Sequence, residues 1–311
     1  MSRSKRFGIV GLVFALFLWA LAGIIVKLLA QRGIDQDIQN LYRYASATLG
    51  LWVLIAVIFG RRALAALTHW KYLLLPVIFN FLYQVARVHG LYQPSIFPGF
   101  VSLLLMSSVI CSVVLAFILF RDERKNILSR RYLAGTGMAI VGVAGVILMG
   151  EWGKPDFNFG VLVLMIASLF WSGYTLSMKS AVRRINPILA FTAVATLTTL
   201  FFAVLATVRS HPEQFLEINR FDQALIVLSG LLGIGTAHSL YFYAVKQLGV
   251  AICATALLLL PVFTLLVSWA ILGECLLPGQ FVMGIVLLAG VYLCSYGRNT
   301  EKAEQTDKVS G

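Results

Sequence analysis

The stretch LFWSGYTLSMK at residues 169–179 resembles the stretch FLWALAGIIVK at residues 17–27. In each of them a tryptophan precedes a lysine by eight positions, and the two tryptophans lie 152 residues apart. Both stretches fall inside longer apolar segments, as expected for two copies of one membrane helix. The similarity therefore predicts an internal duplication of the chain.

The composition of the chain predicts a membrane protein. Of its 311 residues, 59% are hydrophobic and 12% are charged, and the mean hydropathy is +0.88. Soluble domains carry about a quarter charged residues, so we expect a polytopic protein surrounded by the lipid bilayer. The net charge of +12 is spread over loops between apolar runs. This dispersal indicates membrane topology and no nucleic-acid partner.

Ten apolar runs are long enough to cross a membrane, since a spanning helix needs about 20 residues. The first run continues beyond a possible signal-peptide cleavage site at residues 20–22, so we expect it to be retained as a helix. The polar tail after Arg298 is expected to be disordered. The ten runs comprise residues 8–29, 40–60, 72–92, 97–119, 132–150, 159–178, 188–208, 223–244, 250–272 and 279–297.

The basic residues predict the orientation of these spans. With the N-terminus in the cytoplasm, 18 of the 25 lysines and arginines fall in cytoplasmic segments. The positive-inside rule therefore predicts that both termini are cytoplasmic. We expect a multi-pass protein of the bacterial inner (plasma) membrane.

The far ends of the two halves also match. FILFRDE at residues 117–123 aligns with SWAILGE at residues 268–274, at an offset of 151. Each half holds five spans, and because five is odd, the second half must insert upside down relative to the first. The predicted fold is an all-α polytopic membrane protein with ten transmembrane helices in two inverted-topology five-helix repeats, and its substrate site is expected near the bilayer midplane. The predicted units are residues 1–151, 152–297 and the tail 298–311.

The second half also carries a recognisable series of motifs. An alanine-rich helix leads to a Pro-Val-Phe element, then to a Gly-Glu pair, and then to a glutamine and a glycine-spaced helix. The residues concerned are Pro261, Val262, Phe263, Gly273, Glu274, Gln280, Gly284 and Gly290. This series closely resembles the EamA-type repeat of the drug/metabolite transporter superfamily. The first half is a weaker copy, in which Val109-Ile110 replaces the Pro-Val-Phe element.

The resemblance covers nearly the whole chain and includes Arg43, which lies in NLYRYASA early in the second helix. It implies ten helices in two inverted units, alternating access, and the export or exchange of metabolites. It does not imply one substrate, because the superfamily carries amino acids, sugar phosphates, nucleotide derivatives, amines and drugs.

The acidic residues argue against several other functions. All 13 of them lie in loops or at the ends of predicted helices. An intramembrane aspartyl protease, a sodium site or an acidic proton relay would need carboxylates within the spans. Common hydrolase and nucleotide-binding motifs do not occur, and the four cysteines lack metal-ligand spacing. We therefore expect neither an enzyme nor a metal or cofactor site.

The third predicted helix carries a polar stripe. At positions i, i+3, i+4 and i+7 it presents Asn80, Tyr83, Gln84 and Arg87. At about 100° per residue these positions share one helix face. An arginine facing lipid near a helix centre costs about 2.5–3.5 kcal/mol. The stripe is therefore expected to face a wet cavity and bind substrate, with structural hydrogen bonding as the alternative.

His238 is the equivalent of Arg87 at the offset of 151, and it shares a helix face with Tyr241. The pseudo-symmetric pair would lie toward opposite ends of the cavity. With an unperturbed pKa of about 6.5, His238 is a candidate for proton coupling, and hydrogen-bonded packing is the alternative. For Arg43, substrate contact and a structural role at the helix end are equally open.

Aromatic and basic residues mark the helices that begin each half. Trp19, Trp171 and Tyr174 either stack on a substrate or pack against neighbouring helices. Lys27 and Lys179 close the same helices and are expected to extend to the membrane surface.

Together these features predict a secondary transporter for a small organic metabolite. The leading hypothesis is an exporter of amino acids or related anionic or zwitterionic metabolites. Arg87 and Arg43 would hold the carboxylate of the substrate, and aromatic side chains would hold its apolar part.

Two alternatives remain open at this stage. One is a transporter of organic cations, bound in an aromatic cage formed by the tryptophans with Tyr83, Tyr174 and Tyr241. The other is a non-transporting membrane sensor or assembly protein, whose soluble partner would dock at residues 121–131. Under each of these hypotheses we expect the protein to be a monomer or a homodimer.

Overall fold

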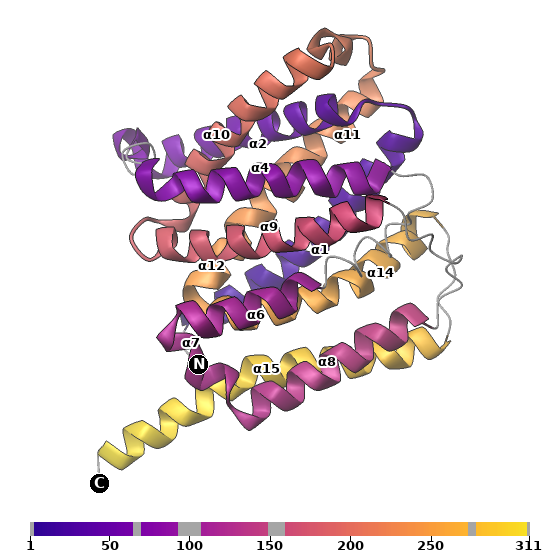
Figure 1. Ribbon diagram of the computed structural model, residues 1–311. Helices are drawn as coiled ribbons and strands as arrows, with labels where there is room; N and C mark the ends of the chain where they lie inside the picture. The colour runs from indigo at the N-terminus through magenta and orange to yellow at the C-terminus, as the bar shows by residue number, and fades with distance from the viewer. Residues whose placement is uncertain (1–2, 65–69, 93–106, 149–158, 273–277, 310–311) are drawn as a thin grey trace.

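The computed structural model describes residues 3–64, 70–92, 107–148, 159–272 and 278–309, and its regular structure within these ranges is helical (Figure 1). The first half contains α1 (Arg3–Gln31), α2 (Gln36–Phe59), η1 (Gly60–Leu64), α4 (Trp70–Tyr92), α6 (Ser107–Leu119), α7 (Arg121–Ile127) and α8 (Arg130–Leu148). The second half contains α9 (Phe159–Val182), α10 (Pro187–Arg209), η2 (Pro212–Leu216), α11 (Arg220–Ser229), η3 (Gly230–Thr236), α12 (Ala237–Leu248), α13 (Val250–Ala256), η4 (Leu257–Leu259), α14 (Leu260–Leu272) and α15 (Pro278–Val309).

The all-α polytopic fold is confirmed. Among the described residues, seven helical segments are long and apolar enough to cross a membrane, and two shorter apolar helices accompany them. The eighth predicted run corresponds to α11, η3 and α12 in continuous succession, and the ninth corresponds to α13, η4 and α14. The N-terminal part of the run at 97–119 lies outside the described residues.

The C-terminal tail differs from the expectation of disorder, because α15 continues as a helix to Val309. The reason is local. Beyond Gly297 the segment contains neither proline nor glycine, and it is rich in glutamate, lysine, alanine and glutamine, which favour helices.

Polar side chains close the ends of several helices. Asp35 caps α2 by accepting hydrogen bonds from the backbone N–H groups of Asp37 and Ile38. Asn186 caps α10 in the same way, and Pro187 follows it at a position where a helix needs no N–H donor. These caps fix where each span begins, and so they fix the depth of the side chains that follow.

Helices that are equivalent in the two halves run antiparallel to each other. Between α2 and α10, Thr48 is hydrogen-bonded to Thr199 at 2.8 Å, and Trp52 donates to Thr196 at 2.9 Å. Residue numbers thus rise along one helix as they fall along the other. The same order relates α8 and α15, where Gly135 faces Cys294. The second half is therefore inverted relative to the first, as predicted.

The packing of helices follows a two-fold pseudo-symmetry. Helix α1 packs against α12, and its equivalent α9 packs against α4. Likewise α1 contacts α14, and α9 contacts α6. Equivalent residues can touch only near the symmetry axis, and two such pairs do: Thr48 with Thr199 at an offset of 151, and Trp19 with Trp171 at an offset of 152. The axis therefore passes through the middle of the bundle.

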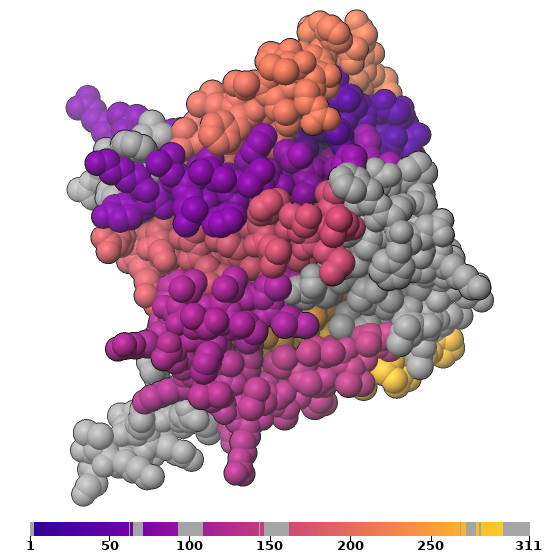
Figure 2. Space-filling model, in the orientation of Figure 1, coloured from indigo at the N-terminus to yellow at the C-terminus, as the bar shows by residue number. Residues whose placement is uncertain are grey.

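The exterior of the bundle is apolar. Figure 2 shows one face of the molecule, on which α4, α9 and α6 are packed side by side. Large hydrophobic side chains on these helices and on α8 are exposed, among them Leu75, Ile118, Val141 and Leu169. A surface of this kind suits lipid and not water. Both chain termini lie at the same end of the bundle as α7 (Figure 1).

Close packing of α8 on α15 leads to a stability prediction. A methyl group added at Gly142 would lie 2.5 Å from the backbone nitrogen of Leu287, whereas one added at Gly137 would have nothing within 4 Å. We expect Gly142→Ala to lower the free energy of unfolding by about 1–3 kcal/mol, because the helices must separate. Gly137→Ala, the matched control in the same helix, should be neutral or slightly stabilising. Thermal unfolding in detergent measures both, and equal stability of the two variants would contradict this packing.

Candidate substrate site

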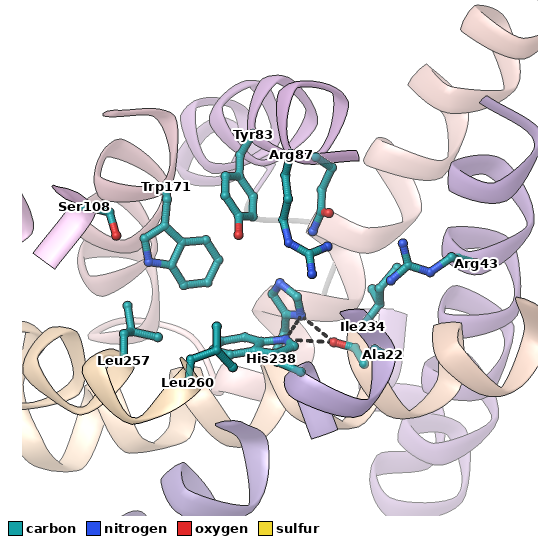
Figure 3. A pocket seen from close by; sticks show the side chains of 13 residues that line it. Ala22, Arg43, Tyr83, Arg87, Ser108, Trp171, Ile234, His238, Leu257 and Leu260 are labelled. Carbon is teal, nitrogen blue, oxygen red and sulfur yellow. Dashed lines mark hydrogen bonds between the residues drawn. The ribbon is translucent and has the colours of Figure 1, made fainter. Parts of the chain in front are cut away.

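A small cavity lies between the two halves of the bundle (Figure 3). Its volume is about 50 Å³, which is room for a few water molecules. Helices of both halves contribute to its walls. The lining residues are Trp19, Ala22, Arg43, Tyr83, Gln84, Arg87, Ser108, Trp171, Gly233, Ile234, His238, Leu257 and Leu260.

Two arginines give the cavity its charge. Arg43 is 2% exposed; its Nε donates to the hydroxyl of Ser229 at 3.1 Å, and its Nη1 has no hydrogen-bond partner among the described residues. Arg87 reaches from α4 toward α1, where a methyl group added at Gly23 would lie 3.5 Å from its Nη2. Within the described residues, neither arginine forms an ion pair, and the cavity lining contains no carboxylate. The cavity is therefore strongly electropositive.

A π-helical segment, η3, brings the backbone of the eighth span against this site. Insertions of this type commonly occur at functional positions. Its glycines permit close approach, because a methyl group at Gly230 would collide with the backbone carbonyl of Arg43, and one at Gly233 would collide with the side chain of Ala22. The eighth span thereby lies directly on α1 and α2.

The carbonyl group of Gly233 organises two aromatic side chains. The indole Nε1 of Trp19 donates to the Gly233 oxygen at 2.8 Å, and Nδ1 of His238 lies 3.1 Å from the same oxygen. The two rings meet edge to face with their centroids 4.9 Å apart. These contacts fix the position of His238 in the wall of the cavity.

Aromatic rings from both halves form the other side of the cavity. The ring centroids of Trp19 and Trp171 are 5.3 Å apart, and those of Tyr83 and Trp171 are 4.8 Å apart. Such edge-to-face and tilted contacts are favourable arrangements for aromatic pairs. Trp171 lies on the side of the cavity away from Arg43, whereas Tyr83 lies beside Arg87 (Figure 3).

The structure brings seven of the ten sequence-predicted site residues to the cavity: Trp19, Arg43, Tyr83, Gln84, Arg87, Trp171 and His238. Three others lie behind it. Asn80 is buried, accepts a hydrogen bond from the hydroxyl of Tyr44 and donates to that of Thr198, so it joins α4 to α2 and α10. Tyr174 and Tyr241 pack against Trp171 and do not line the cavity.

Arg87 and His238 do not lie toward opposite ends of the site, as their symmetry relation had suggested. Figure 3 shows the Arg87 guanidinium group pointing toward the His238 ring. The physical reason is that both residues lie close to the pseudo-symmetry axis, where equivalent positions converge.

Sequence reasoning missed the remaining lining residues, which are Ala22, Ser108, Gly233, Ile234, Leu257 and Leu260. Most are apolar or small, and such side chains in a span carry no sign of whether they face a cavity or a neighbouring helix. The cluster of glycines around Gly233 was a usable signal, because it marks a close approach of helices.

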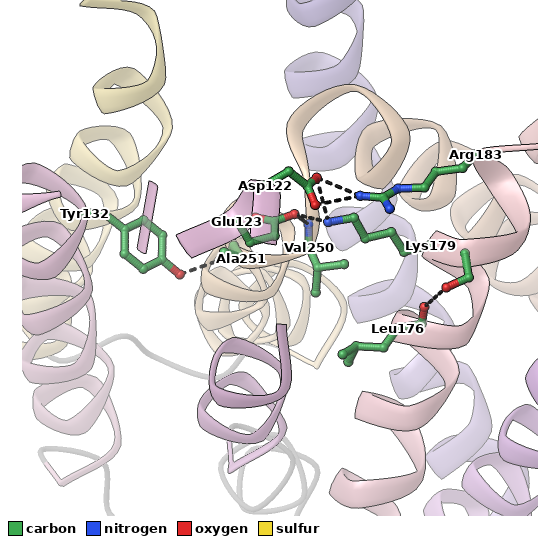
Figure 4. A network of polar contacts seen from close by, with 9 residues as sticks. Asp122, Glu123, Tyr132, Leu176, Lys179, Arg183, Val250 and Ala251 are labelled. Carbon is green, nitrogen blue, oxygen red and sulfur yellow. Dashed lines mark hydrogen bonds and ion pairs between the residues drawn. The ribbon is translucent and has the colours of Figure 1, made fainter. Parts of the chain in front are cut away.

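A second polar cluster lies at the end of the bundle that holds α7 (Figure 4). Nζ of Lys179 is 2.5 Å from Oε1 of Glu123, and the two side chains are 5% and 4% exposed. The same carboxylate oxygen accepts a hydrogen bond from the backbone N–H of Val250 at 2.9 Å. Glu123 thus joins α7, α9 and α13. Contrary to the expectation from the sequence, Lys179 does not extend to the membrane surface. Its amine instead lies over the Phe120 ring.

A glycine makes this contact possible. Gly249 has a φ of 90°, and a side-chain carbon there would lie 2.5 Å from Oε1 of Glu123. Both the backbone conformation and the close approach therefore require glycine.

Asp122 extends the cluster toward the surface. Both of its oxygens lie 2.7 Å from Nη2 of Arg183. Partial burial raises the pKa of Asp122, but the hydrogen bond from Arg183 and the positive charge of Lys179 outweigh this effect, and the resulting pKa is lower than usual. Lys27 is the counterpart of Lys179 in the first half and lies at the opposite end of the bundle. There it donates a hydrogen bond to the backbone carbonyl of Leu91 at 3.0 Å.

Comparison with known proteins finds a family match in the second half of the chain. Residues 158–296 match the EamA-like transporter family. The second half is therefore an EamA-like transporter domain. The chain is 25% identical to an uncharacterised transporter of Haemophilus influenzae, over 61% of this chain and 63% of that protein. The aligned region thus covers less than two thirds of that relative.

Other relatives extend the similarity over nearly the whole chain. The chain is 23% identical to a WAT1-related protein of Arabidopsis thaliana, over 93% of this chain and 86% of that one. A solved crystal structure superposes with a TM-score of 0.73 at 13% identity, covering 94% of this chain and 98% of the other. At that identity the superposition supports the fold alone.

Proposed function

We propose that this protein is a secondary transporter that exports a small organic acid or zwitterion, such as an amino acid, across the inner membrane. One observation carries the proposal: Arg43 and Arg87 line a cavity that contains no carboxylate among its described residues. A buried charge without a partner is unfavourable. An anionic group on the substrate would supply the missing partner, and a guanidinium group can bind it through two parallel hydrogen bonds.

The aromatic side of the cavity provides for the rest of the substrate. Trp19, Trp171 and Tyr83 add apolar ring surface to the wall of the cavity. A molecule with a carboxylate at one end and an apolar group at the other would satisfy both walls. This is the chemistry of an amino acid or a short organic acid.

The small size of the cavity supports an alternating-access mechanism. Ligand pockets generally have volumes of about 300–1,000 Å³, whereas this cavity has about 50 Å³. A metabolite can therefore enter only if the helices around the site move apart. The inverted repeats offer the means, since each half can adopt the conformation of the other and expose the site to the opposite side.

The same charges argue against the two alternative functions. An organic cation in the aromatic cage would lie beside two uncompensated arginines, and like charges at close range repel. A non-transporting sensor would need a docking surface at residues 121–131. In the structure, however, Asp122 and Glu123 of this segment are paired with Arg183 and Lys179 of the same chain. We accordingly propose neither of these functions, and no enzymatic activity.

Flux measurements with purified protein in liposomes test the proposed function. The vesicles would be loaded in turn with amino acids, with organic acids and with amines of matched side chains. We expect efflux of the acids, because the site supplies a fixed positive charge, and none of the amines. Efflux of amines alone would contradict the proposal and favour the cation alternative.

The orientation in the membrane gives a separate prediction. Reporter fusions after Arg62, Arg131 and Arg184 should be cytoplasmic, because these basic loops lie at the end of the bundle that we place inside. Fusions at Gly33 and Glu217 should be external. An external signal after Arg131 would contradict the orientation, whatever the substrate.

A further inference from the structure

His238 carries a buried polar atom that no part of the described structure satisfies. The residue is 2% exposed, and its Nε2 has no hydrogen-bond partner among the described residues. The imidazole ring stacks on Phe191, with an interplanar angle of 6° and a centroid distance of 5.1 Å. With Trp19 against its edge, the ring is held in one orientation.

The contacts of the ring favour one position for its proton. The Gly233 oxygen lies 3.1 Å from Nδ1 of His238. The indole N–H of Trp19 lies 2.8 Å from the same oxygen and 3.3 Å from Nδ1, so we assign its hydrogen bond to the closer oxygen. An unprotonated Nδ1 would place its lone pair against the lone pair of the carbonyl oxygen, which is repulsive. The carbonyl has two lone pairs and accepts from both Trp19 and a protonated Nδ1. Nε2 is then an unprotonated hydrogen-bond acceptor.

The ring is also unsuited to bind a second proton. Arg43 and Arg87 line the same cavity, and among the described lining residues no carboxylate is present to balance a third positive charge. A charged imidazole would be repelled by both guanidinium groups. His238 therefore acts as a neutral acceptor, and the proton-coupling role that its sequence position suggested is not part of our proposal.

An unpaired acceptor in an apolar wall is unfavourable until a donor reaches it. In Figure 3 the tip of the His238 ring points across the cavity toward Arg87. On the α4 side of the same cavity a second buried acceptor, Oε1 of Gln84, also has no partner among the described residues. A substrate whose carboxylate is held by the arginines would thus have acceptors beside that carboxylate on two walls.

We propose that the substrates carry a hydrogen-bond donor next to the carboxylate, and that Nε2 of His238 accepts the hydrogen bond from it. The class so selected comprises 2-amino and 2-hydroxy acids, as opposed to unsubstituted acids with the same side chain. This inference rests on the proposed function, since it requires that the arginines bind the carboxylate. It goes further by assigning to His238 the recognition of the neighbouring substituent.

The test uses four compounds that share one side chain. They are leucine, 2-hydroxy-4-methylpentanoate, 4-methylpentanoate and 3-methylbutylamine, and parallel sets carry a methyl or a benzyl side chain. Dissociation constants are measured by calorimetry on the purified full-length protein. We expect the amino and hydroxy acids to bind at least about 10-fold more tightly than the unsubstituted acid, because the latter leaves Nε2 unpaired.

Two variants of His238 form a matched pair. In His238→Asn the side-chain amide can still donate to the Gly233 oxygen, but nothing replaces Nε2, so the affinity ratio between substituted and unsubstituted acids should fall toward one. In His238→Gln the longer amide reaches the place of Nε2, so part of the ratio should be retained. Melting temperatures confirm that both variants are folded, and the ratio of affinities is unaffected by a uniform loss of active protein.

The outcomes separate the two proposals. Equal affinity of the wild type for the substituted and unsubstituted acids overturns the role of His238 and leaves the anion transporter in place. A ratio that is unchanged in His238→Asn does the same. Binding of the amine alone, or of no acid in any set, overturns the proposed function, and the inference that rests on it fails as well.

Discussion

Replacing Glu123 by glutamine should lower the free energy of unfolding by about 3–5 kcal/mol, which is the usual effect of removing one partner from a buried ion pair. The substituted amide can still accept the hydrogen bond from Val250 N–H, but it leaves Lys179, which is 5% exposed, with only the carboxylate of half-exposed Asp122 at 3.4 Å. The loss is therefore expected toward the lower end of that range. Lys179→Met should have an effect of similar size. Chemical or thermal unfolding in detergent measures both variants.

A neighbouring pair in the same cluster supplies the control. Arg183 is paired with Asp122, but the two side chains are 49% and 53% exposed. Ion pairs in contact with solvent contribute about 0–1 kcal/mol, so Arg183→Ala should change the stability little. The double variant of Glu123 and Lys179 should lose less than the sum of the single variants, because neither charge is then left alone. Single variants as stable as Arg183→Ala would contradict the importance of burial here.

Replacing Arg87 by alanine should weaken substrate binding by about 2–5 kcal/mol, as expected when one partner of a buried charged pair is removed. The guanidinium group has no competing ion pair within the described structure, so its interaction with the substrate is not offset by a lost internal contact. Uptake or efflux of amino acids and organic acids in liposomes measures the effect, together with a direct binding measurement.

Arg87→Lys separates charge from geometry. Lysine keeps the positive charge but lacks the planar group that binds a carboxylate through two hydrogen bonds, so this variant should retain weak transport. Arg220→Ala is the control, because Arg220 is exposed, lies outside the cavity and contacts Gln223. Normal transport by Arg87→Ala would refute an anion site at this position.

The fold was largely predictable because a membrane span depends on the average hydropathy of a whole segment and not on single residues. Apolar runs of sufficient length located the spans, and the odd number in each half predicted the inversion. The π-helical segment at Gly230–Thr236 was not predictable, since its residues are as apolar and as helical in pattern as their neighbours. Its geometry depends on what α1 and α2 present to it. The continuation of α15 also escaped prediction, because a polar tail was judged by polarity and not by helix propensity.

The site was predictable where a polar side chain had no alternative place in a span. Helical periodicity correctly placed Tyr83, Gln84 and Arg87 on one face, which lines the cavity. It could not show that Asn80, one turn earlier, is hydrogen-bonded to Tyr44 and Thr198. Such a contact depends on which helices flank α4 at that depth. The pairing of Lys179 with Glu123 was missed for a similar reason, as a lysine at a helix end has the same sequence context whether it meets water or a carboxylate 56 residues away.

The hydrogen bond between Thr48 and Thr199 bears on the alternating-access cycle that we propose. Points on a two-fold axis stay in place when the two halves exchange shapes, so this bond at 2.8 Å can persist through every turnover. Contacts at the ends of the bundle have no such protection. If the proposed cycle opens the end that holds α7, the ion pair of Lys179 with Glu123 is among the contacts there that would have to break. The activation barrier of turnover would then arise largely at an ion pair that never touches the substrate. Transport rate and substrate affinity could accordingly evolve at different residues.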